Sequence, residues 1–164
     1  MKKTVIIVHH AGKGGERSTF RSIRAWHVGT RPNGNGWSDI GYHVVIEKDG
    51  TVQRGRKDEN IGAHTRGWNR QSLGVCVCGN FEHQLVQTKQ WNALIDQITR
   101  WCLEHAISPG SDTIVGHRDK QPTKTFKKNG RVVSKPNTCP GKNLYRYLPW
   151  LRKEVRNRWM RHMA

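Results

Sequence analysis

The sequence predicts a single α/β domain in which a central mixed β-sheet is flanked by α-helices, and three observations support this prediction. The chain has 164 residues, which is ample for one hydrophobic core and short for two. Short apolar runs typical of buried strands alternate with segments of helical periodicity, so crossover connections between strands are expected. One pair of strand-like runs surrounds an Asp-Gly turn, which adds a hairpin to the sheet.

The first half of the chain contains a strand, a helix and this hairpin. Residues 5–8 (VIIV) form an apolar run between charged residues and a Gly-rich loop, which is typical of a buried strand. A helical pattern then opens at Ser18. The hairpin follows over residues 42–53. The apolar face of the helix is expected to contain Phe20, Ile23 and either Trp26 or His27.

The second half alternates strands and helices in the same way. Residues 72–77 are typical of a buried strand, and residues 88–105 of an amphipathic helix. A Ser-Pro-Gly break precedes a short strand at 113–115. A basic amphipathic helix is predicted at about 148–163, because apolar residues recur there every four positions among arginines. These apolar residues are Leu151, Val155, Trp159 and Met163.

Positive charge is concentrated in the last quarter of the chain, whose formal net charge is +17 in total. Residues 120–164 hold 13 of the 29 basic side chains and one of the 12 acidic ones. This imbalance predicts an anionic partner, which is a nucleic acid, a membrane surface or an acidic cell envelope. Within it, residues 120–137 form a basic insertion whose Asn-Gly pair favours a small protruding hairpin.

The sequence shows no targeting or membrane segment. No apolar run approaches the ~18–20 residues of a membrane span, and the run at 5–8 is too short for the core of a signal peptide. We therefore expect a soluble domain without an export signal, made in a reducing compartment. Three cysteines are then expected to be free, buried packing residues. These are Cys76, Cys78 and Cys102.

Two histidines and the fourth cysteine form the candidate chemical site. His9 and His117 each lie at the carboxyl end of an apolar strand, and Cys139 lies in a loop-like segment 22 residues after His117. If the two strands are neighbours, both imidazoles emerge at one sheet edge. Two imidazoles and one thiolate supply three ligands for tetrahedral zinc and leave the fourth position for water. Scattered histidines and a buried thiol are the alternative, since spacing alone does not decide.

Several short motifs occur in one order between about residues 5 and 150. They are VHHA (8–11), RAWH (24–27), GWSDIGYH (36–43), DGTV (49–52), GAH (62–64), SLGV (72–75), GHRD (116–119) and CPG (139–141). Together they resemble the zinc amidases that include small phage endolysins and the peptidoglycan recognition proteins. The resemblance implies a mixed sheet with flanking helices. It also implies hydrolysis of the amide that joins N-acetylmuramic acid to L-alanine in peptidoglycan.

The resemblance also implies roles for single residues. His9, His117 and Cys139 match the ligands of one zinc ion, and Tyr42 matches the active-site tyrosine. Asn137 stands two residues before the cysteine, where relatives often have Lys or Thr that helps to stabilise the reacting carbonyl. The sequence leaves open whether Asn137, the adjacent Thr138 or the nearby Lys135 assists the reaction here. His10, His27 and His43 are expected to be structural. Substrate contacts are expected for His64, Trp68, Asn69, Asn80 and Thr138.

The resemblance further implies a monomeric phage endolysin with peptidoglycan as its partner. Such an enzyme is made in the host cytoplasm and reaches the cell wall after the inner membrane is permeabilised. The basic helix at 148–163 either lies on an anionic membrane surface or covers the core with its apolar stripe. A peptidoglycan-recognition module without activity is an alternative, disfavoured by the full ligand set. A nucleic-acid-binding protein is another, for which no zinc-finger spacing or RNA-binding motif is present.

Overall fold

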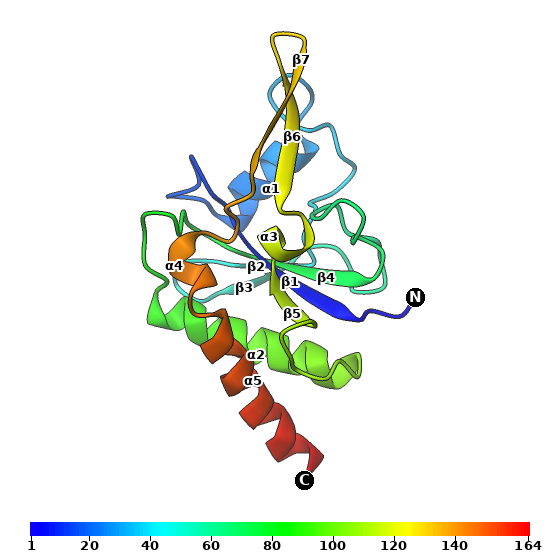
Figure 1. The fold of residues 1–164 in the computed structure, drawn as a ribbon, viewed down its shortest axis with the longest axis vertical. Coiled ribbons are helices and arrows are strands. Elements are labelled where there is room, and N and C mark those ends of the chain that lie inside the picture. The colour runs from blue at the N-terminus through cyan, green and yellow to red at the C-terminus, as the bar shows by residue number, and fades with distance from the viewer.

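Five strands form the central sheet in the order β3-β2-β4-β1-β5 (Figure 1). The computed structural model describes all residues from 1 to 164. β1 runs parallel to both β4 and β5, β2 runs parallel to β4, and β3 is antiparallel to β2. The sheet is therefore mixed, as the sequence predicted. The strands are β1 (Val5–His10), β2 (Val44–Ile46), β3 (Val52–Arg54), β4 (Ser72–Val77) and β5 (Ile114–Gly116).

Helices cover both faces of this sheet. Two long helices, α2 (Thr88–Glu104) and α5 (Leu148–Met163), lie together on one face, while α1 (Phe20–Val28) lies on the other (Figure 1). The main core of 19 buried residues forms between the sheet and α2 and α5. The opposite face holds two smaller apolar clusters. Two short helices complete the fold, α3 (His117–Lys120) and α4 (Lys142–Tyr145).

The structure resolves which residue completes the buried face of α1. Thr19 caps the helix, because its hydroxyl accepts a hydrogen bond from the backbone N–H of Ser22. His27 is buried, whereas Trp26 is 55% exposed. The helix thus begins one to two residues later than expected, and its inward face contains His27 in place of Trp26.

The basic insertion folds into a hairpin that projects from the domain (Figure 1). Its strands are β6 (Thr123–Lys128) and β7 (Arg131–Pro136), which form a separate two-stranded sheet. Asn129 and Gly130 have φ angles of 49° and 74°, the positive values that a tight two-residue hairpin turn requires. The predicted hairpin is confirmed, and its strands are longer than the Asn-Gly signal alone indicated.

Helix α5 uses its apolar stripe to cover the core. Leu148, Leu151 and Val155 are buried, and Trp159 packs against the same cluster, whereas Met163 is 65% exposed. The stripe therefore ends before the last turn. No helix in the structure is both long enough and apolar enough to span a bilayer. All four cysteines are free and buried, as expected for Cys76, Cys78 and Cys102.

Candidate functional site

The register of the sheet brings the two candidate histidine ligands together. Val8 of β1 pairs with Gly116 of β5, so His9 and His117 follow side by side at one sheet edge. Their ring centroids are 4.4 Å apart. Cys139 joins them from the loop after β7, and the ligand atoms of the three side chains all lie within 4.8 Å of one another. All three residues are buried. The juxtaposition predicted from the sequence is therefore present.

A hydrogen-bond chain behind His9 fixes its tautomer. The hydroxyl of Ser72 donates to the carbonyl oxygen of Trp68 at 2.7 Å, so its oxygen accepts from Nε2 of His64 at 3.4 Å. Nδ1 of His64 is then an acceptor for Nε2–H of His9, at 3.0 Å. The proton of His9 thus lies on Nε2, and its bare Nδ1 faces Sγ of Cys139 at 3.8 Å. Such outer hydrogen bonds orient metal-binding histidines.

His117 is oriented in a similar way by a residue that sequence reasoning missed. Its Nε2 lies 3.0 Å from Oε1 of Gln121, an oxygen that only accepts, so Nε2–H donates and Nδ1 is free for a metal. Gln121 stands four residues after His117, immediately past α3. The spacing of four residues was visible in the sequence, but the short helix α3 that brings the two side chains to the same side was not predicted.

Asn137 positions Cys139 through hydrogen bonds of its side-chain amide. Oδ1 of Asn137 accepts from the backbone N–H of Cys139 at 3.1 Å, and Nδ2 donates to the carbonyl of Gln121 at 2.8 Å. Asn137 is also buried. Asn137 therefore holds the loop that carries Cys139, and its role as a donor to the reacting carbonyl stays a prediction.

Tyr42 stands beside the cluster, where the resemblance placed it. Its ring centroid is 5.1 Å from that of His9, and the side chain lines the same hollow. Burial, reinforced by neighbouring thiols, raises the pKa of Tyr42 well above its usual value of 10. The phenol therefore keeps its proton and is a hydrogen-bond donor at neutral pH.

The electrostatics of the three ligands suit a divalent cation. Burial lowers the pKa of His117 to about 4 and that of His9 well below its usual value, so both rings are neutral. Burial also raises the pKa of the Cys139 thiol to about 11, so a thiolate needs a cation beside it. Two neutral imidazoles and one sulfur, without any carboxylate, form the donor set that zinc prefers. The residues present therefore fit zinc.

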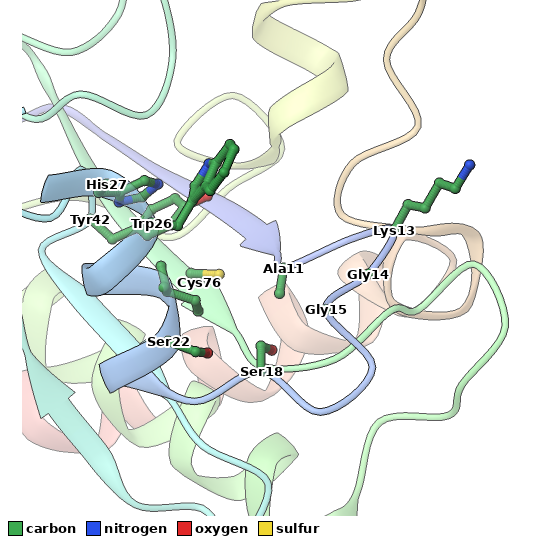
Figure 2. A pocket seen from close by; sticks show the side chains of 11 residues that line it. Ala11, Lys13, Gly14, Gly15, Ser18, Ser22, Trp26, His27, Tyr42 and Cys76 are labelled. Atoms are coloured by element: carbon green, nitrogen blue, oxygen red, sulfur yellow. The ribbon is translucent and has the colours of Figure 1, made fainter. Parts of the chain in front are cut away.

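The cluster opens into a hollow of about 290 Å³. A larger hollow of about 520 Å³ adjoins it and shares Ala11, Lys13 and Tyr42 with it. Figure 2 shows this larger hollow between the Gly-rich loop and α1, with Trp26 at its rim and Tyr42 deeper. The two hollows together form a groove with the cluster in its smaller part. The smaller part is lined by His9, His117, Cys139, Tyr42, Thr138, Lys124 and Lys135, among others.

Of the five residues expected to contact substrate, Thr138 lines the groove and His64 lies behind it. Thr138 is exposed beside Cys139. His64 is packed against His9, with ring centroids 5.0 Å apart, and its two ring nitrogens are used in the hydrogen-bond chain. A side chain at Gly74 would collide with this ring at 2.6 Å, so the glycine makes room for it. The structure thus assigns His64 to the support of His9.

Trp68, Asn69 and Asn80 also stabilise loops, and none of them lines the hollow of the cluster. Trp68 packs on the apolar cluster around Ile7. Oδ1 of Asn69 accepts from the backbone N–H groups of His64 and the following residue, both at 2.8 Å. Nδ2 of Asn80 donates to the carboxylate of Glu16 at 2.7 Å. These contacts hold loops near the cluster, and the substrate contacts expected of the three residues stay predictions.

The three histidines expected to be structural bind backbone groups, as predicted. Each accepts a hydrogen bond from a backbone N–H through Nδ1. His10 accepts from Phe81, at 3.1 Å. His27 and His43 do the same for two glycines and are buried. None of the three belongs to the cluster of ligand atoms.

Known proteins share this fold and parts of this sequence. The endolysin of Escherichia phage T7 is 41% identical over 78 residues, or 47% of this chain and 48% of that protein. The matched part thus spans about half the length of the curated relatives that come first. The amidase LysC from Clostridium intestinale URNW has a TM-score of 0.69 at 28% identity, covering 87% of this chain and 79% of that one. Drosophila PGRP-LB, at 24% identity and the same TM-score over 90% and 79%, shares the fold.

A family profile matches most of the chain. The profile described as N-acetylmuramoyl-L-alanine amidase covers residues 1–142, which include β1, the groove and all three members of the cluster. Since this match extends over most of the 164 residues, the chain belongs to the N-acetylmuramoyl-L-alanine amidase family.

Proposed function

We propose that the protein is a zinc-dependent hydrolase that cleaves the amide between N-acetylmuramic acid and L-alanine in bacterial peptidoglycan. The observation that carries this proposal is the convergence of His9, His117 and Cys139, with ligand atoms within 4.8 Å, at the floor of a groove beside Tyr42. The family match supports the same reaction. A recognition module without activity would not need this complete ligand set, and the full set favours the enzyme.

An amide resists hydrolysis because its carbonyl is a poor electrophile and neutral water is a poor nucleophile. A bound zinc ion would lower the pKa of a coordinated water and would polarise the carbonyl as a Lewis acid. The chain supplies the positioning. His64 and Gln121 hold the two ligand rings in the tautomers that leave Nδ1 bare, and Asn137 holds Cys139. Tyr42, protonated at neutral pH, donates a hydrogen bond to the negative charge that develops on the substrate oxygen.

We further propose that the protein acts as a monomeric phage endolysin. In this role it is made in the host cytoplasm and reaches the wall once the inner membrane is permeabilised. Its similarity to the endolysin of Escherichia phage T7 supports this part of the proposal. The +17 net charge suits a target that contains carboxylates and lies close to anionic envelope polymers.

A contact between α5 and anionic membrane surfaces is a separate part of the proposal. The apolar stripe of this helix is used in the core, yet Trp150, Met160 and Met163 remain more than half exposed among arginines. Cosedimentation with vesicles that contain anionic lipid checks this contact. We expect binding that weakens in Trp150→Ala and with added salt. Equal binding of the wild type to neutral and anionic vesicles, or none to either, would contradict it.

The experiment for the main proposal combines metal analysis with product analysis. Purified protein is expected to contain about one zinc per chain, and to release new amino termini on L-alanine from purified peptidoglycan. Cys139→Ala should lose the metal and at least about a thousandfold in rate while remaining folded by circular dichroism. His83→Ala, at an exposed histidine outside the cluster, serves as the control. Full activity in Cys139→Ala, or in chelator-treated protein, would rule out the zinc mechanism.

A further inference from the structure

The β6–β7 hairpin presents an ordered row of positive charge on one of its faces. Its residues 123–136 include five basic side chains and no acidic one. In an antiparallel ribbon, directly paired residues share a face, and alternate residues along each strand return to that face. From base to tip, the pairs on one face are Lys124 with Lys135, Phe126 with Val133, and Lys128 with Arg131.

The base of this face lies in the groove. Lys124 and Lys135 both line the hollow that contains the ligand cluster, and Lys124 is half-buried there. Nζ of Lys135 lies 5.3 Å from the ring centroid of Phe126, which agrees with their place on the same face. The base of the hairpin therefore forms one wall of the groove, and the rest of the hairpin extends this wall away from the cluster.

The paired lysines lack a counter-charge within the chain. Neither takes part in any of the six ion pairs of the structure. Like charges directly opposite each other on a ribbon repel and destabilise it. An anion held between the two ammonium groups relieves this repulsion and forms charge-assisted hydrogen bonds with both.

We propose that Lys124 and Lys135 form a carboxylate-binding site for the peptide stem of the substrate, and that the face beyond them extends the contact along the polymer. This inference rests on the proposed function, because the site adjoins the cluster and its ligand must belong to the molecule being cleaved. A muramoyl peptide carries carboxylates and no phosphate. Beyond the lysine pair, Phe126 and Val133 form an apolar contact surface on the same face. Lys128 and Arg131 form a second cationic pair near the tip.

Kinetics on two soluble substrates test the site. One is a muramoyl-peptide fragment with free stem carboxylates, and the other is the same fragment with those carboxylates amidated. On the free fragment, Lys124→Gln/Lys135→Gln should raise KM about tenfold, the loss of roughly one charge-assisted contact. Its kcat should stay within about twofold, because binding that is equal in ground and transition states affects only KM. On the amidated fragment, variant and wild type should have the same KM.

A charge-matched control separates a site from general electrostatics. Lys127→Gln/Lys2→Gln removes the same charge, from the opposite face of the hairpin and from the exposed amino-terminal segment. It should leave KM on both fragments unchanged. The proposal is overturned if the control raises KM as much as the groove variant. It is also overturned if the groove variant affects both fragments equally, or lowers kcat with KM unchanged.

Binding measurements keep this test independent of the amidase activity. Chelator-treated protein, which does not turn over, is titrated with each fragment by calorimetry. Tighter binding of the free fragment by about tenfold, lost in Lys124→Gln/Lys135→Gln, supports the site even if the proposed reaction fails. Equal binding of both fragments overturns it. Loss of binding to duplex DNA or anionic vesicles in that variant, with fragment binding intact, assigns the pair to that other partner and also overturns it.

Discussion

At the scale of single residues, His64 supports the cluster without belonging to it. Its Nδ1 accepts the proton of His9 Nε2, and its own Nε2–H is held by Ser72. Only this arrangement leaves Nδ1 of His9 bare toward the thiol of Cys139. The rotational freedom of His9 and the proton position on its ring are thus both set by a neighbour 55 residues away.

We expect His64→Ala to weaken zinc binding by about 10–100-fold, because His9 loses the partner that fixes its tautomer and orientation. Competition with a chromophoric chelator measures the affinity. His27→Ala removes another buried histidine, one outside the cluster, and should retain nearly full affinity. If both variants lose zinc to the same degree, general destabilisation rather than support of His9 explains the loss.

A second residue-scale prediction concerns stability and pH. Nδ1 of His43 accepts from the N–H of Gly74, and Nε2 donates to the carbonyl of Asn60, so the folded protein needs a neutral ring. Burial lowers the pKa of His43 from 6.5 to about 4. On acidification the unfolded chain therefore takes up this proton first. The stabilising contribution is complete above pH 6.5 and is lost as the pH falls from 6.5 toward 4.

Urea unfolding of metal-free protein at pH 7 and pH 5 tests whether acidification lowers the free energy of unfolding through His43. The wild type should lose about 2 kcal/mol more of its free energy of unfolding between these values than His43→Gln does. The other buried histidines titrate in both proteins and cancel in the comparison. Equal losses in the two proteins would show that His43 is not the group responsible.

The juxtaposition of His9, His117 and Cys139 was predictable, because each histidine ends an apolar strand and all three residues match family motifs that occur in order. The roles of Asn137 and Gln121 were not. Asn137 stands where a donor to the substrate was expected, and the structure adds that it holds the loop between Gln121 and Cys139. The contacts of both residues depend on how the basic insertion folds. Its sequence has no helical or strand periodicity from which that fold could be predicted.

At the scale of elements, predictions succeeded where an apolar period was long. Helix α2 shows about five turns of apolar spacing and was located within one residue of its bounds. Helix α1 is nine residues long, and its period fits either Trp26 or His27 on the inward face. Packing decided for His27, whose Nδ1 accepts a hydrogen bond from a buried N–H. Short helices leave such choices to tertiary contacts.

The β6–β7 hairpin shows the opposite case, in which a turn signal located an element whose length and purpose were hidden. The Asn-Gly turn is a local signal, and both residues adopt the positive φ angles it predicts. Backbone pairing continues from the turn to Thr123 and Pro136, although no hydrophobic core lies beneath these strands. Only the structure shows that their base reaches the groove.

At the scale of the whole molecule, the cluster joins three distant parts of the chain. Its ligands come from the end of β1, the start of α3 and the loop after β7. The sheet fixes the first two, since β1 and β5 are paired. Cys139 reaches them only after the chain has passed through the hairpin. A bound cation would therefore link the loop after β7, which carries Cys139, to the central sheet. Zinc binding should for this reason increase the stability of the fold.

Zinc is expected to raise the melting temperature of the metal-free protein. Because the unfolded chain holds the ligands far apart, free zinc at about 100 times its dissociation constant stabilises the fold by about 2.7 kcal/mol. For a domain of this size that corresponds to roughly 5–10 °C. Calorimetry of chelator-treated protein with and without zinc measures the shift, which His83→Ala should retain and Cys139→Ala should lose. An equal shift in Cys139→Ala would place the bound zinc elsewhere, and no shift in the wild type would mean that the three segments do not close on a cation.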